Sequence, residues 1–173
     1  NLNQNTNLFG YKIKMFSVII PTFNNLEYLK LCIESLENNS KYKHELIFYI
    51  NEGSDGSHEY LKNKKYKFKY SKINKGVCVA FNEAVKLATN KYIVLGHDDM
   101  YFCPNWDTVF MNELQLIKEK DFFLSGIMVQ RTNADLILDC GSNYKDFNKN
   151  KLLDELPKMQ ANDFQGTHWQ PSL

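Results

Sequence analysis

The sequence predicts an α/β fold with a mostly parallel central sheet covered by helices on both faces. Between residues 16 and 117, short apolar runs alternate with segments whose apolar residues recur three and four positions apart. This alternation is typical of parallel sheets, because a helix usually makes the crossover between two parallel strands. Aromatic residues form 14% of the 173 residues, and this content also favours strands.

The first two expected strands are Phe16–Pro21 and Glu45–Ile50, both short apolar runs. Residues 25–38 lie between them and carry apolar side chains at helical spacing, which predicts an amphipathic helix. Asn24 stands three residues before Glu27, an arrangement that resembles a capping box at the start of this helix.

The later part of the chain continues the alternation. Lysines interleave with aromatic residues over Tyr66–Tyr70, which predicts a strand with one solvated face at a sheet edge. We expect Trp106 in the core at the start of a helix and His44 in a surface loop. The remaining expected elements are a short helix near Ser57, a helix from Gly76 to about Ala88, a strand over Lys91–Gly96, a helix capped by Asn105, and strands over Phe122–Val129 and Leu136–Leu138.

Composition excludes several classes of protein. Hydrophobic residues form 43% of the chain, so disorder is not its main state, and the formal net charge is only +1. Arg131 is the single arginine, which argues against nucleic acid as a partner. No apolar run reaches the roughly 18–20 residues of a membrane span. The four cysteines show no C-x-x-C pair, which argues against zinc and favours a reducing compartment.

Four polar segments follow the ends of expected strands: Thr22–Asn25, Asn51–Ser57, Asn74–Gly76 and Gly96–Asp99. Ligands of parallel sheets bind outside the carboxyl ends of the strands. If the strands are parallel, the four segments converge on one edge, and this convergence is the central inference from the residues.

Asp98 and Asp99 end an otherwise apolar strand. Adjacent carboxylates repel, and a divalent cation such as Mg²⁺ relieves that repulsion while binding substrate phosphates. A surface turn is the alternative for such a pair. A dinucleotide fingerprint, a P-loop and a hydrolase nucleophile elbow are all absent from the sequence. A phospho-accepting aspartate is disfavoured, because no acid follows the first strand.

Four motifs in order resemble the family 2 glycosyltransferases, whose nucleotide-sugar half has the GT-A, Rossmann-like fold. They are Phe16-Ser-Val-Ile-Ile-Pro-Thr-Phe-Asn24, Asn51-Glu-Gly-Ser-Asp-Gly-Ser57, Asn74-Lys-Gly-Val-Cys-Val-Ala-Phe-Asn82 and Leu95-Gly-His-Asp-Asp99. The resemblance runs from about Phe16 to Asp107 and more faintly to the end of the chain.

The resemblance implies roles for individual residues. Nucleotide-binding positions are Pro21, Thr22, Phe23, Asn24, Glu52, Gly53, Ser54, Asn74, Lys75, Gly76, Asn82 and Asp98. Metal-binding positions are Asp98 and Asp99, with His97 as a further candidate for a Mg²⁺ or Mn²⁺ ion. The polar and aromatic stretch around His168 and Trp169 resembles one that lines a donor-sugar or acceptor site.

The implied reaction is a metal-assisted, inverting transfer of a sugar from a nucleoside-diphosphate sugar, with UDP favoured, to an unknown glycan, lipid or protein acceptor. Three positions depart from the family pattern: Phe23 replaces tyrosine, Glu52 replaces aspartate, and Gly96 replaces the first acid of the metal motif. A non-catalytic nucleotide-sugar-binding or interaction domain therefore stays open, as does, less favoured, a nucleotidyltransferase.

We expect residues 1–14 to be a leader or extra segment and residues 15–173 to form the nucleotide-sugar-binding domain, truncated before the full acceptor half. The general base is expected downstream of Leu173, so this chain alone should have little or no transferase activity. The expected location is cytoplasmic, with peripheral membrane attachment through other segments as the alternative.

Overall fold

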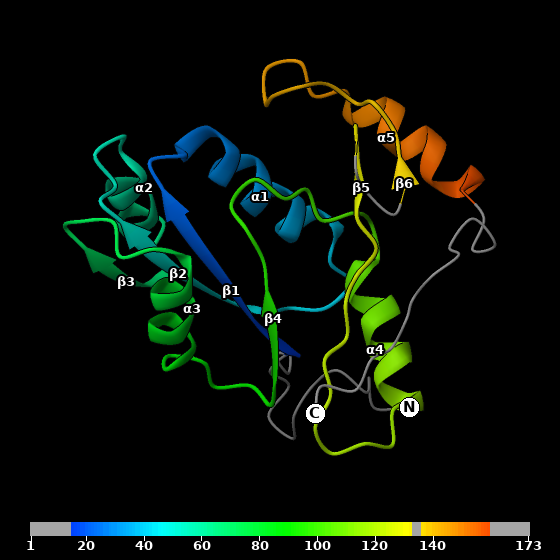
Figure 1. The fold of residues 1–173 in the computed structure, drawn as a ribbon, viewed down its shortest axis with the longest axis horizontal. Coiled ribbons are helices and arrows are strands. Elements are labelled where there is room, and N and C mark those ends of the chain that lie inside the picture. The colour runs from blue at the N-terminus through cyan, green and yellow to red at the C-terminus, as the bar shows by residue number, and fades with distance from the viewer. Residues whose placement is uncertain (1–14, 133–135, 160–173) are drawn as a thin grey trace. The chain divides into compact units, whose positions relative to one another are not determined.

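Four parallel strands form a sheet in the order β3-β2-β1-β4 (Figure 1). The strands are β1 (Phe16–Phe23), β2 (Glu45–Asn51), β3 (Lys67–Ser71) and β4 (Tyr92–Leu95). The computed structural model describes residues 15–132 and 136–159. Its two compact units divide between Ile117 and Lys118, and the sheet lies in the first unit.

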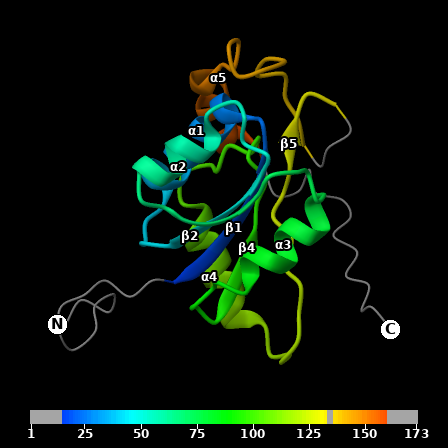
Figure 2. The same cartoon turned by 90° about the vertical axis from the view of Figure 1, so that its left-hand side faces the viewer.

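Helices cover both faces of this sheet, as the sequence predicts. They are α1 (Leu26–Asn39), α2 (Ser57–Asn63), α3 (Val77–Val85) and α4 (Trp106–Leu116). Figure 2 shows α1 and α2 on one side of the strands and α3 on the other. The arrangement follows from strand geometry, because successive side chains point to opposite faces.

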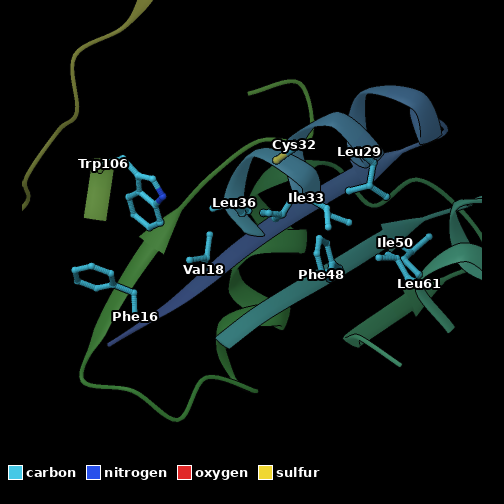
Figure 3. Packing of buried hydrophobic residues seen from close by; sticks show 11 residues of the cluster. Phe16, Val18, Leu29, Cys32, Ile33, Leu36, Phe48, Ile50, Leu61 and Trp106 are labelled. Carbon is cyan, nitrogen blue, oxygen red and sulfur yellow. The ribbon is translucent and has the colours of Figure 1, made fainter. Parts of the chain in front are cut away.

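The larger core lies under α1, α2 and α4. Val18 and Ile20 of β1 pack there with residues of these helices, including Ile33 and Trp106 (Figure 3). Ile19, between them in sequence, packs on the opposite face against α3. Trp106 is 8% exposed, which confirms its predicted place in the core.

His44 is not the surface residue that the sequence suggests. Its side chain is 3% exposed, and its Nε2 lies 3.0 Å from Oδ2 of Asp107. Its ring stacks on Phe16, with ring centroids 5.3 Å apart. A partner 63 residues away in sequence therefore makes this polar side chain compatible with the core.

The second unit departs from the predicted strands. Instead of a strand over Phe122–Val129, only β5 (Val129–Gln130) forms, and it pairs in parallel with β6 (Leu136–Ile137). A strand needs a neighbour along its length to satisfy its backbone groups, and β6 offers β5 only two residue pairs. The unit also contains α5 (Lys149–Glu155) and the 3₁₀ helix η1 (Leu156–Lys158), which the sequence analysis missed. No helix among the described residues is long and apolar enough to cross a membrane.

Candidate functional site

The polar segments that follow β1 to β4 meet at the carboxyl edge of the sheet. All four strands are parallel, so their carboxyl ends lie at the same edge. Oδ1 of Asn24 accepts a hydrogen bond of 2.9 Å from the Ser54 NH, which links the first two segments. Oδ1 of Asn51 accepts one of 2.8 Å from the Lys75 NH, which links the second to the third. The convergence predicted from the sequence is therefore present.

The end of β1 and the residue that follows it combine two buried positions with two exposed ones. Pro21 and Thr22 are buried inside β1. The Phe23 side chain is 47% exposed at the end of the strand. Asn24 follows with a φ of 47°, in the left-handed region that asparagine adopts more readily than most residues. An open aromatic ring beside polar groups is suited to form one wall of a site for a planar ligand.

The segment after β2 turns sharply through two left-handed residues. Glu52 has a φ of 65° and Gly53 a φ of 73°. A Cβ on Gly53 would lie 2.7 Å from Cγ2 of Ile50, so both the backbone and the packing require glycine there. The Glu52 NH donates a 2.8 Å hydrogen bond to the Ser71 carbonyl. These contacts hold the Glu52 backbone, while its side chain is half-buried and Ser54 is exposed.

The segment after β3 leads into α3. Oδ1 of Asn74 accepts a 2.8 Å hydrogen bond from the Gly76 NH. Gly76 has a φ of 81°, and nothing lies within 4 Å of the Cβ that a larger residue would bring. Lys75 and Asn82 are exposed, the first on this segment and the second on α3. Asn82 is thus exposed like the segment, but its side chain makes no hydrogen bond with another described residue that would place it in the site.

The segment after β4 carries the acidic pair. Asp98 is half-buried, whereas His97 and Asp99 are exposed. Burial raises the pKa of Asp98, Thr22 and Asn25 oppose the rise, and the charge of Asp99 adds to it. Two acids share this loop, and a cation there would offset the unfavourable burial and repulsion of their charges.

Side chains of α1 hold the loop after β4, which we call the acidic loop (residues 96–102), through hydrogen bonds. The Cys32 thiol donates a 3.4 Å hydrogen bond to the His97 carbonyl. The Ser35 hydroxyl accepts a 2.9 Å hydrogen bond from the Phe102 NH, and the Asn39 amide donates one of 2.6 Å to the Phe102 carbonyl. Sequence reasoning missed these residues, because their partners lie more than 60 positions away.

Asp55 is a further residue that the sequence analysis did not assign. Its Oδ2 accepts a 2.6 Å hydrogen bond from the Leu26 NH at the start of α1. Its Oδ1 accepts bonds from the Ser57 NH and hydroxyl at 3.1 and 2.7 Å. The cap of α1 thus comes from another loop, and neither Asn24 nor the N-cap residue Asn25 supplies a side-chain cap. The available signal was the aspartate of the motif Ser54-Asp-Gly-Ser57.

The metal assignment rests on Asp98 and Asp99. No group of three or more His, Cys, Asp or Glu side chains in the described ranges could hold a metal ion. The His97 ring packs edge-on against Phe81, with centroids 5.5 Å apart. His168 and Trp169, predicted to line the donor-sugar or acceptor site, lie outside the described residues.

The chain is similar to known sugar transferases. The model of glycosyl transferase family 2 matches residues 17–161. The chain is 30% identical over 125 residues to an uncharacterised glycosyltransferase of Rickettsia bellii, an alignment covering 69% of this chain and 17% of that protein. It is 28% identical over 148 residues to the chondroitin synthase of Pasteurella multocida, covering 82% of this chain and 15% of that protein. The chain therefore spans only a small part of the length of these relatives.

The fold also has a solved counterpart. A mannosyltransferase from Pyrobaculum calidifontis, in complex with GDP-Man and Mn²⁺, superposes with a TM-score of 0.52 at 19% identity. The match covers 61% of this chain and 32% of that one. At this identity the likeness concerns the fold, and it agrees with the predicted GT-A class.

Proposed function

The chain belongs to glycosyl transferase family 2. We therefore propose that it binds a nucleoside-diphosphate sugar at the carboxyl edge of its sheet and takes part in the transfer of that sugar to an acceptor. One observation carries the proposal. Hydrogen bonds join the loops after β1, β2 and β3 at the carboxyl edge of the sheet, and Asp98 follows β4 at the same edge. The sugar, the acceptor and the inverting course of the reaction belong to the same proposal.

The nucleotide base is proposed to lie against Phe23, with Glu52 at its polar edge. The Phe23 ring is 47% exposed and supplies apolar surface. A carboxylate only accepts hydrogen bonds when ionised, so Glu52 suits a base edge that presents an N–H. Uracil presents one such group, and UDP, which the family resemblance favours, is the proposed nucleotide. Guanine presents two, which makes GDP the first competitor to test.

The diphosphate is proposed to lie between the Asn74–Gly76 segment and the acidic loop. Asp98 and Asp99 would hold a divalent cation, which suits ions that take one or two protein carboxylates and complete their shell with phosphate and water. The raised pKa of Asp98 is consistent with this role, because burial leaves its charge poorly compensated. When bound, the cation would stabilise negative charge on the leaving diphosphate.

The test is calorimetric titration with UDP, GDP, CDP and ADP, with and without Mn²⁺. We expect Mn²⁺-dependent binding, strongest for UDP, and a loss of at least about tenfold in affinity for Asp98→Asn. Asp121→Asn removes an exposed acid from the second unit and is the matched control. If none of the nucleotides binds in a Mn²⁺-dependent manner, the donor-site assignment is wrong.

A non-catalytic nucleotide-sugar-binding domain is the second candidate, and Gly96 is the observation that favours it. Gly96 is buried, and a Cβ there would lie 3.1 Å from Cζ of Phe102. A side chain at this position would therefore crowd the Phe102 ring, which would have to shift for the missing acid of the metal motif to fit. Donor binding without donor hydrolysis or transfer, in a protein that includes the flanking segments, would favour this candidate.

A further inference from the structure

A pattern of lysine next to tyrosine stands at the start of three strands of the sheet. The runs are Lys41-Tyr-Lys43 before β2, Lys64-Lys-Tyr66 before β3, and Lys91-Tyr92 at β4. Tyr11-Lys-Ile-Lys14 precedes β1 in sequence but lies outside the described residues. Because the four strands are parallel, the three described runs lie at one edge. We call it the amino edge, formed by residues 41–43, 64–66 and 91–92, opposite the candidate donor site.

The positive charges of this edge are available to a partner. Lys41, Lys43, Lys64, Lys65 and Lys91 are all exposed. Within residues 15–132 and 136–159, no ion pair involves any of these five lysines. The ammonium groups of Lys41 and Lys91 instead lie 5.8 and 4.8 Å from the ring centroids of Tyr42 and Tyr92.

The acidic side chains near this edge are already engaged. Glu45 at the start of β2 is buried and pairs with Lys67 at 2.9 Å. Asp107 is fully buried beside His44. Glu37, near the end of α1, accepts a 2.5 Å hydrogen bond from the Tyr66 hydroxyl. Glu37 keeps its charge, but the five exposed lysines outnumber it, so the edge presents a local excess of positive charge although the whole chain has a formal net charge of only +1.

We propose that the amino edge docks on a membrane surface that contains anionic phospholipid. Lysines near such a surface each contribute to the attraction, and tyrosine side chains favour the boundary between water and lipid. The side chains are suited to a diffuse negative surface rather than to nucleic acid. None of the five cations is an arginine that could bind a phosphate or base in bidentate fashion. Tyr42, Tyr66 and Tyr92 are half-buried, which limits stacking of bases on their faces.

Docking of this kind would leave the candidate donor site open to solution. The eight residues of β1 span about 25 Å from the amino edge to the carboxyl edge. A chain held at its amino edge thus turns Asp98 and Phe23 away from the lipid, where a water-soluble nucleotide sugar can reach them. The proposal is independent of the donor chemistry, since the two sites share no residue.

The test is sedimentation of the full chain with vesicles of phosphatidylcholine, alone or with about one third phosphatidylglycerol. We expect binding only to the anionic vesicles, and its loss as salt rises, because the attraction is screened. The variant Lys41→Gln/Lys43→Gln/Lys64→Gln/Lys91→Gln should bind these vesicles at least about tenfold less. Its Mn²⁺-dependent nucleotide binding should be unchanged, which shows that it has folded.

The matched control is Lys72→Gln/Lys118→Gln/Lys120→Gln/Lys145→Gln. It removes the same number of positive charges from exposed positions outside the amino edge, and we expect vesicle binding within about twofold of the unchanged chain. Equal losses in the two variants would overturn the proposal in favour of a net-charge effect. Failure of the unchanged chain to bind anionic vesicles, or tighter binding to a single-stranded RNA homopolymer, would also overturn it.

Discussion

Oδ2 of Asp55 accepts a 2.6 Å hydrogen bond from the backbone NH of Leu26, the first residue of α1. One carboxylate thus caps a helix from a loop 29 positions further along the chain and ties together the segments after β1 and β2. Negative charge at a helix N-terminus is stabilised by unpaired NH groups and the helix dipole. The geometry of the proposed base site therefore depends on Asp55.

We expect Asp55→Ala to lower the free energy of unfolding by about 1 kcal/mol, the usual effect of losing a capping side chain. Nucleotide affinity should fall as well, because the segments that carry Asn24 and Glu52 lose the hydrogen bond from Leu26 to Asp55 that joins them. Urea unfolding and calorimetry measure the two effects. Asp121→Ala, which removes an exposed acid in the second unit, should change neither, and an unchanged unfolding midpoint for Asp55→Ala would contradict the capping role.

The stability supplied by Asp55 should depend on pH. Burial opposes ionisation, but hydrogen bonds from Ser57 and Leu26 prevail and lower its pKa below the ordinary 3.8. A carboxylate with a lowered folded-state pKa stabilises the protein above its unfolded-state pKa, and that contribution is lost as pH falls through the folded-state pKa. The difference in unfolding free energy between the unchanged chain and Asp55→Asn should therefore shrink below pH 3.8, as urea unfolding at several pH values can show.

Glu45 should make the free energy of unfolding depend on acid pH more strongly than Asp55 does. Burial by itself would raise the pKa of Glu45, but hydrogen bonds from Ser17, Lys67 and Thr89 lower it from 4.5 to about 2. A shift of this size corresponds to about 3 kcal/mol of stability. It is complete above pH 4.5 and lost as pH falls toward 2. Glu45→Gln should flatten the acid limb of the stability curve, whereas the exposed control Glu113→Gln should leave it in place.

Substituting two glycines of the site should distinguish the cost of backbone strain from the cost of a steric contact. Gly76→Ala should cost about 1 kcal/mol, because its φ is 81° but no atom lies within 4 Å of the new Cβ. Gly53→Ala adds a 2.7 Å contact with Ile50 to a φ of 73°, so it should cost clearly more. Equal unfolding free energies for the two variants would show that Ile50 moves aside without cost.

Ser35 should matter for both stability and cation dependence. Ser35→Ala leaves the Phe102 NH without its 2.9 Å acceptor, and an unsatisfied group of this kind costs about 1–3 kcal/mol. The acidic loop would lose one anchor, so we expect weaker Mn²⁺-dependent nucleotide binding. Binding without Mn²⁺ should change less, since it depends on Phe23 and Glu52 and not on the acidic loop that Ser35 supports. Ser35→Thr keeps the hydroxyl and should restore much of the loss.

The spacing of apolar residues was sufficient to predict those elements that depend on local sequence. The apolar runs at Phe16–Pro21 and Glu45–Ile50 predicted β1 and β2, and their alternation with helical spacing predicted a mostly parallel sheet with helices on both faces. The structure confirms this with α1 on one face and α3 on the other. Parallel strands then bring the polar segments to one edge. Because this step follows from topology alone, the convergence of Asn24, Asn51 and Asp98 was predictable.

Contacts between distant segments were not predictable. His44 became a core residue because Asp107 lies 3.0 Å from its ring. The strand expected over Phe122–Val129 was reduced to β5, because only the two residues of β6 pair with it.

The sequence by itself determined the fold class, the family motifs and the edge at which the candidate site lies, since all three depend on residue order and local spacing. Tertiary structure decided what holds that site. The cap on Leu26 comes from Asp55, and the support of the acidic loop comes from Ser35 and Asn39. A hydrogen bond between residues far apart in the chain depends on how the whole sheet folds, and no local pattern encodes it.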